Sequence, residues 1–275
     1  CSHGDSHKVS IERNREGHPW GECVDSPWDL RKAVRRRLRE NPDAIKIWAT
    51  GGGIWRWETA MDQHYTMEEV QAVVDECKMR HVPVWSHCFG SAANSVKAGV
   101  DLIIHGQSLD DGTLDLMAEK GIALCPTINF MPAWLTTFPP RYDPALHDQY
   151  PGETVAQKDL NRIYANLKKA KERGILLTTG SDSFNSQMTP YGETTVGELH
   201  AFVECAGISE MDTIVAATLN GAKVLRVDKV TGSLEAGKSA DLLGINGNPL
   251  RNIRELTVDT MDVIMKEGDF IKKDL

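Results

Sequence analysis

The chain has 275 residues, enough to bury a sizeable core in one large domain or in two smaller ones. Hydrophobic residues make up 41% of it and charged residues 25%, as is usual for a globular protein. A formal net charge of -8 argues against nucleic acid or an anionic membrane as the main partner, and no apolar run approaches the roughly 20 residues that span a bilayer. The 6 cysteines are scattered without CxxC spacing, so we expect a reducing, cytoplasmic setting.

Helix and strand signals alternate along most of the chain. Ser26 and Pro27 predict the start of a helix, which ends before Asn41 and Pro42. The strand AIKIWAT follows, and then Thr66 forms a capping box ahead of an amphipathic helix. The later strands VPVWS, VDLII, IALCPT and ILLTTG are separated by helices expected over about 91–98, 112–120 and 153–173, and further helices cover about 195–225. This alternation predicts a parallel sheet.

Two segments depart from this pattern. A long loop from Ile128 to about Gly152 is rich in proline and aromatic residues, which is typical of a substrate lid. From about Val227, short strands broken by glycine and asparagine predict a small β subdomain.

Four ionisable residues stand at or near the carboxyl tips of separate expected strands. They are Lys46, His87, His105 and Asp182. In a parallel β/α barrel all such tips open onto one face, where barrel enzymes place their chemistry. Imidazoles and a carboxylate are good ligands for a divalent metal, and a lysine that has reacted with carbon dioxide becomes a carboxylate-like bridge between two cations.

Each of these residues also has a simpler interpretation. Either histidine could be structural, Lys46 could form a salt bridge across the barrel, and Asp182 could cap a turn or a helix. Four ionisable groups at strand tips are costly to desolvate unless they share a partner, and we therefore predict a metal site.

The motifs around these residues resemble the amidohydrolase superfamily in order and spacing. They are IKIWATGG, VWSHCFG, GVDLIIHGQSLDD, TTGSDS and the closing GSLEAGKSADLLGINGNPL. Within the superfamily the chain is most similar to imidazolonepropionase-like and Xaa-Pro dipeptidase-like hydrolases. The resemblance implies an α/β fold in which residues 1–226 form strands four to eight of a TIM-type (β/α)8 barrel. Residues 227–275 would then be the C-terminal part of a composite β-sandwich.

The resemblance also assigns roles to the four tip residues. Lys46 would be carbamylated and bridge two divalent ions, with zinc as the expected metal, while His87 and His105 would bind one ion. Asp182 would bind the other ion and move protons. The implied reaction is hydrolysis of an amide-type C–N bond in a dipeptide, N-acyl amino acid, urea or carbamate by a metal-bridging hydroxide.

Two departures from the family pattern matter. The family's HxH pair on the first strand has no counterpart, since His3 and His7 are four apart in a polar loop. We therefore expect the chain to begin after the third strand, and the strand edges left open would allow a homo-oligomer. Phe89 stands where relatives often carry a second histidine.

Substrate choice is harder to read, although a small molecule is the expected partner. Aromatic and polar side chains near the strand tips could form its pocket, or could simply pack between the loops. These candidates are Trp55, Trp57, His64, Tyr65, Phe130 and Trp134.

Two other functions remain open at this point. One is a mononuclear deaminase or cyclic-amide hydrolase, although relatives of that type usually lack the lysine found here as Lys46. The other is an inactive fragment or binding chain, which the missing HxH pair favours. Metal content would separate these possibilities. We expect about two ions per intact barrel for the binuclear hydrolase, one for the mononuclear enzyme and none for the inactive chain.

Overall fold

The computed structural model describes residues 22–52, 60–132, 155–183 and 189–274. The chain divides into two compact units, of which unit 1 comprises Cys1–Leu124 and Trp134–Ile175, and unit 2 comprises Cys125–Ala133 and Leu176–Leu275. The expected boundary at residue 227 falls inside unit 2, and it stays a prediction. Within the described ranges, no helix combines the length and the apolar character that a membrane crossing requires.

A four-stranded sheet begins in unit 1, and its strands lie in chain order. The strands are β1 (Ile45–Trp48), β2 (Val84–Cys88), β3 (Leu102–His105) and β4 (Ala123–Cys125). β1 pairs with β2, and β2 with β3, in parallel. The predicted parallel sheet is therefore confirmed for these strands, and the carboxyl ends of β1, β2 and β3 lie at one edge.

Three helix ends in unit 1 coincide with signals in the sequence. Ser26 Oγ accepts the N–H of Asp29, and Thr66 and Glu69 form the predicted capping box. Gly121 ends a later helix with a φ of 68°, a left-handed conformation that glycine adopts easily. The five helices described in this unit are α3 (Pro27–Leu38), α4 (Met67–Lys78), α5 (Ala93–Ala98), α6 (Asp111–Lys120) and α8 (Val155–Glu172).

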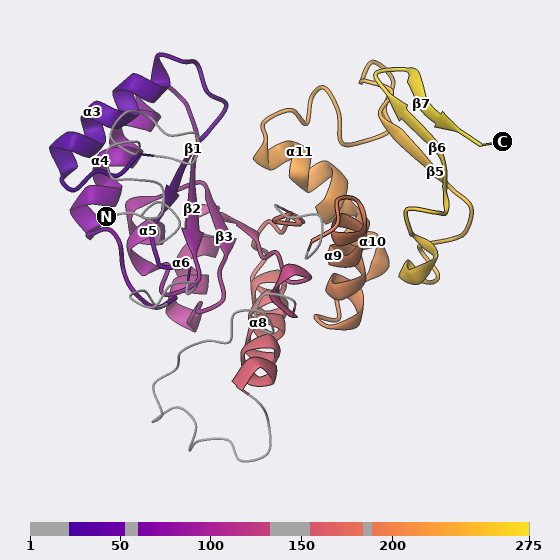
Figure 1. The fold of residues 1–275 in the computed structure, drawn as a ribbon, viewed down its shortest axis with the longest axis horizontal. Helices are drawn as coiled ribbons and strands as arrows, with labels where there is room; N and C mark the ends of the chain where they lie inside the picture. Colours follow the sequence, from indigo (N-terminus) through magenta and orange to yellow (C-terminus); the bar gives the residue numbers. More distant parts are fainter. Residues whose placement is uncertain (1–21, 53–59, 133–154, 184–188, 275) are drawn as a thin grey trace. The chain divides into compact units, whose positions relative to one another are not determined.

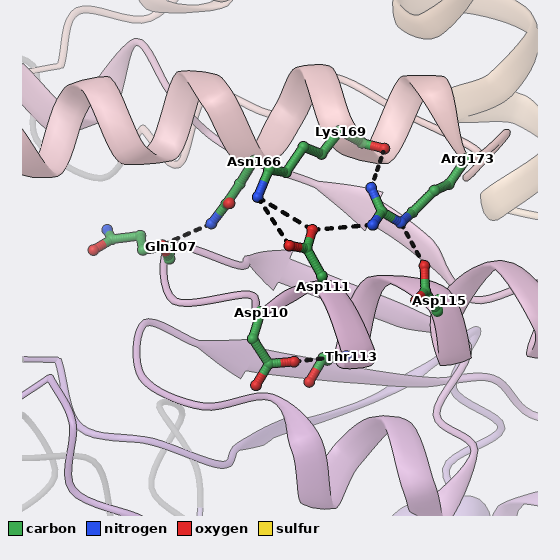
Figure 2. Close-up of polar contacts among 8 residues, drawn as sticks. All are labelled: Gln107, Asp110, Asp111, Thr113, Asp115, Asn166, Lys169 and Arg173. Carbon is green, nitrogen blue, oxygen red and sulfur yellow. Dashed lines mark hydrogen bonds and ion pairs between the residues drawn. The ribbon is translucent and has the colours of Figure 1, made fainter.

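These helices pack against one another in sequence, α3 on α4, α4 on α5, α5 on α6 and α6 on α8 (Figure 1). At the last of these contacts, Asp111 on α6 accepts hydrogen bonds from Lys169 of α8 and from Arg173, which directly follows α8 (Figure 2). The Asn166 amide donates to the carbonyl of Gln107 at 3.3 Å, so α8 also holds the chain that follows β3.

Unit 2 contains helices and a second sheet. The helical elements are α9 (Glu193–Glu204), α10 (Glu210–Val215), the π-helix η2 (Ala216–Asn220), α11 (Gly221–Val224) and the 3-10 helix η3 (Ile253–Glu255). The strands β5 (Leu242–Ile245), β6 (Met261–Lys266) and β7 (Asp269–Lys273) form an antiparallel sheet. Val196 and Leu199 of α9 pack with Ile253 and Leu256 in a core cluster, which ties this helix to the segment before β6.

One predicted strand of the parallel sheet is not formed as a strand. Within the segment 175–181 only Leu177 makes a β-bridge. A strand requires a continuous ladder of backbone hydrogen bonds to a neighbour, and an apolar sequence does not supply that neighbour. The segment is nevertheless anchored, because the Asn220 amide of η2 donates to the carbonyl of Leu177 at 2.9 Å.

Candidate metal centre

The two candidate histidines meet at the carboxyl ends of neighbouring strands. His87 Nδ1 lies 3.0 Å from His105 Nε2. The side chains are buried, with exposed fractions of 4% for His87 and 2% for His105. The sequence therefore predicted correctly that these two residues come together, although they are 18 positions apart.

Backbone conformation explains how His105 reaches its partner. In the register of the sheet His87 pairs with Ile104, whereas His105 pairs with Cys88. A regular strand alternates its side chains between the two faces, so His105 would point away from His87. His105 instead has a φ of 72°, and the following Gly106 has a φ of 63°. A left-handed conformation is rare for a residue with a Cβ and is concentrated at functional sites, and here it turns the imidazole toward His87.

The spacing of the two ring nitrogens fits a shared divalent ion. Two tetrahedral ligand nitrogens, each about 2.0–2.1 Å from zinc, lie roughly 3.3 Å from each other. His87 Nδ1 and His105 Nε2 form a hydrogen bond of 3.0 Å, and this distance is close to the separation of two zinc ligands. Within the part of the chain that the structure describes, no three His, Cys, Asp or Glu side chains are grouped so as to hold an ion. The metal-binding role of His87 and His105 stays a prediction.

Lys46 lies on the same face of the sheet as His87. Lys46 pairs with Trp85, and Trp48 pairs with His87, so the two candidates are one pleat repeat apart on adjacent strands. The side chain is exposed, and its Nζ lies 5.5 Å from the centroid of the Trp48 ring. The carbamylation of Lys46 and its bridging role stay predictions.

Asp182 belongs to unit 2, and its part in the metal centre stays a prediction. Its backbone is left-handed, with a φ of 48°, like that of His105. Such a conformation costs of order 1–3 kcal/mol in a residue other than glycine and persists only where the surroundings hold it in place.

Sequence reasoning did not single out Glu198, a carboxyl group that is 0% exposed. It accepts the backbone N–H groups of Ile128 at 3.0 Å and of Asn129 at 2.7 Å. Burial raises its pKa to about 8, against the opposing effect of these hydrogen bonds. The available signal was an acidic residue on the apolar face of a helix, between Val196 and Phe202.

The candidate substrate residues fall into two groups. His64 and Tyr65 are each 8% exposed and Phe130 is 1% exposed, so these three rings are largely packed against protein. Burial also raises the pKa of the Tyr65 phenol. Trp55, Trp57 and Trp134 lie outside the described residues. Substrate contact by any of the six stays a prediction.

Comparison with known proteins identifies the family. The model of the amidohydrolase family matches residues 7–271, and the chain therefore belongs to that family. This confirms the resemblance inferred from the strand-tip motifs.

Individual relatives are similar over most of this chain. Ochratoxinase of Aspergillus niger is 28% identical over 249 residues, which are 86% of this chain and 48% of the relative. The crystal structure of a Xaa-Pro dipeptidase with methionine bound in its active site matches with a TM-score of 0.76 and 32% identity, over 90% of this chain and 59% of that one. The crystal structure of the A. niger ochratoxinase gives a TM-score of 0.77 at 25% identity, over 92% and 56%. The chain thus spans about half the length of the ochratoxinase sequence.

Proposed function

We propose that this chain carries the metal centre of a hydrolase that cleaves amide-type C–N bonds. The observation that carries the proposal is the buried pair formed by His87 and His105, whose ring nitrogens lie 3.0 Å apart at the carboxyl ends of adjacent parallel strands. Membership of the amidohydrolase family supports it. In the complete fold we expect the parallel sheet to form part of a (β/α)8 barrel, which would open these strand ends onto one mouth.

The proposed centre is binuclear and contains divalent ions, with zinc as the first choice. His87 and His105 would hold one ion, Asp182 the other, and carbamylated Lys46 would join them. When bound, such ions polarise a carbonyl group and make water nucleophilic near neutral pH. Asp182 would take the proton of that water and pass it to the departing nitrogen.

For the substrate, we propose a dipeptide or an N-acyl amino acid, with Xaa-Pro dipeptides first. Support comes from the 32% identity to a protein described as a Xaa-Pro dipeptidase. The similarity to ochratoxinase favours testing N-acyl amino acids in parallel.

Metal content provides the direct test. The full-length protein is purified after growth with zinc, cobalt or manganese, and its ions are counted by elemental analysis, alongside His87→Ala and His105→Ala. We expect about two ions in the wild type and a loss of at least one in each variant. His81→Asn is the matched control, because His81 is exposed and left-handed, with a φ of 57°, a conformation that asparagine tolerates.

Two results would contradict the proposal. If both histidine variants kept the full wild-type metal content, the pair would not be a metal site. If the metal-loaded protein hydrolysed no Xaa-Pro dipeptide, N-acyl amino acid, urea or carbamate, the reaction would be wrong. A single ion in the wild type would favour a mononuclear centre instead.

A further inference from the structure

A third ring lies against the two candidate metal-binding imidazoles. The centroid of the Phe89 ring is 4.5 Å from that of His87 and 4.3 Å from that of His105. The imidazole rings themselves are 4.6 Å apart, so the three rings form a closed cluster. Phe89 is 3% exposed, and it follows β2 directly. A shift of the Phe89 ring would therefore change the packing of both imidazoles.

The backbone of Phe89 is held by the hydroxyl of Thr50. Thr50 Oγ1 accepts the N–H of Phe89 at 2.9 Å and the N–H of Gly90 at 3.2 Å. Thr50 is 0% exposed and lies two residues beyond β1, the strand that carries Lys46. One hydroxyl thus ties the tip of β1 to the turn that follows His87.

Thr50 is itself held in place by its neighbours. It forms an antiparallel β-bridge with Gln63, and the N–H of the preceding Ala49 donates to the carbonyl of His87 at 3.1 Å. The turn after Phe89 has little freedom, because a Cβ on Gly90 would lie 2.6 Å from the carbonyl oxygen of Ala60. The backbone at Phe89 and Gly90 is therefore held by Thr50 on one side and by Ala60 on the other.

We propose that Thr50 and Phe89 are positioning residues for the metal centre. Thr50 holds the backbone of Phe89, and the Phe89 ring fixes the orientation of His87 and His105 for a shared ion. The inference rests on the proposed function, since it assumes that the histidines bind metal. Groups that orient metal ligands typically change metal affinity by 10- to 100-fold when they are mutated. A phenyl ring also brings no ligand atom of its own, so it shapes the pair by contact alone.

The test uses cobalt(II) as a spectroscopic probe of the full chain. Cobalt affinity is measured by competition with a chelator, and the visible absorption bands report the ligand geometry. Thr50→Val keeps the side-chain shape but removes the acceptor of both N–H groups, whereas Thr50→Ser keeps the hydroxyl. We expect Thr50→Val to weaken cobalt binding about 10-fold or more and to shift the bands. Thr50→Ser should stay within about 3-fold of the wild type.

Phe89→Leu provides a second, independent variant, because it removes the ring contacts and leaves the hydroxyl of Thr50 unchanged. We expect the same loss of affinity in a protein whose circular dichroism matches that of the wild type. If Thr50→Val does not fold, Phe89→Leu decides the question alone. Wild-type affinity and spectrum in whichever of these two variants folds would overturn the inference.

His87→Ala separates the inference from the function on which it rests. If His87→Ala loses cobalt while Thr50→Val and Phe89→Leu bind it normally, the metal centre stands and the positioning role is wrong. If His87→Ala also binds cobalt normally, the proposed function itself fails.

Discussion

Glu198 accepts the backbone N–H of Asn129 at 2.7 Å, although the two residues are 69 positions apart. The side chain of Asn129 contacts α9, the helix that contains Glu198. Its amide donates a hydrogen bond to the carbonyl of Thr194 at 3.2 Å. A Cβ on Gly197 would lie 2.5 Å from that amide nitrogen, so this contact requires glycine. Helix α9 thereby holds the segment that leads from Thr127 toward the proline-rich loop.

We predict that Glu198 makes stability fall as the pH rises. Its pKa is raised by burial from 4.5 to about 8. Between these two values the folded state binds more protons than the unfolded state, so the stability contribution is full below pH 4.5 and is lost as the pH rises through about 8. Glu198→Gln should lack this component. Urea unfolding of both proteins from pH 5 to 9 would show it, and parallel curves would contradict it.

Glu76 should show the opposite pH dependence. Its carboxylate is 2% exposed and accepts hydrogen bonds from Arg31 at 3.1 Å and from Arg35 at 2.7 Å. The hydrogen bonds from Arg35 are the largest cause that lowers the pKa of Glu76. Its stabilising effect is therefore present above the ordinary pKa of 4.5 and is lost as the pH falls below it.

Glu76→Gln should therefore lower the free energy of unfolding at pH 7 by about 1.5–3 kcal/mol, the range for hydrogen bonds to charged groups. The difference from the wild type should shrink toward pH 3. Asp75→Asn is the control, because its side chain is 42% exposed and should lose less. Equal losses in the two variants would mean that burial of Glu76 is unimportant.

Gly106→Ala should destabilise the protein more than the same change at Gly121. Both glycines are left-handed, with φ of 63° and 68°, so both variants bear the cost of about 1–2 kcal/mol for a Cβ in this conformation. Only at Gly106 would the Cβ also meet side chains, at 2.8 Å from Leu124 and 2.9 Å from Leu109. Thermal unfolding compares the two directly. Equal unfolding temperatures of the two variants would contradict the steric argument. Because Gly106 follows His105, we also expect cobalt binding to weaken in Gly106→Ala and to stay unchanged in Gly121→Ala.

Asp182→Asn should keep the fold and lose catalysis. If Asp182 moves the proton during C–N cleavage, the amide cannot replace it, and turnover should fall at least about 100-fold. Turnover of the metal-loaded protein on its best substrate checks this, with circular dichroism as the control for folding. Near-normal turnover would show that another group moves the proton.

The sequence by itself determined most of the local structure of unit 1. Caps such as Ser26 and the Thr66 capping box act within one helical turn, and they placed the helix starts correctly. The alternation of short apolar strands with helices predicted the parallel sheet, and consecutive parallel strands put His87 and His105 at the same edge.

Only the tertiary structure decided how the side chains of the candidate site are oriented and which groups bind them. By strand register His105 would face away from His87, and its left-handed backbone brings the two together. Thr50 gave no signal in the sequence, because its partners lie 39 and 40 positions away, and Glu198 meets Ile128 across 70 positions. The segment 175–181 reads as a strand, yet only Leu177 bridges. Caps and periodicity are local properties, whereas ladders and buried hydrogen bonds require a partner that only the folded chain supplies.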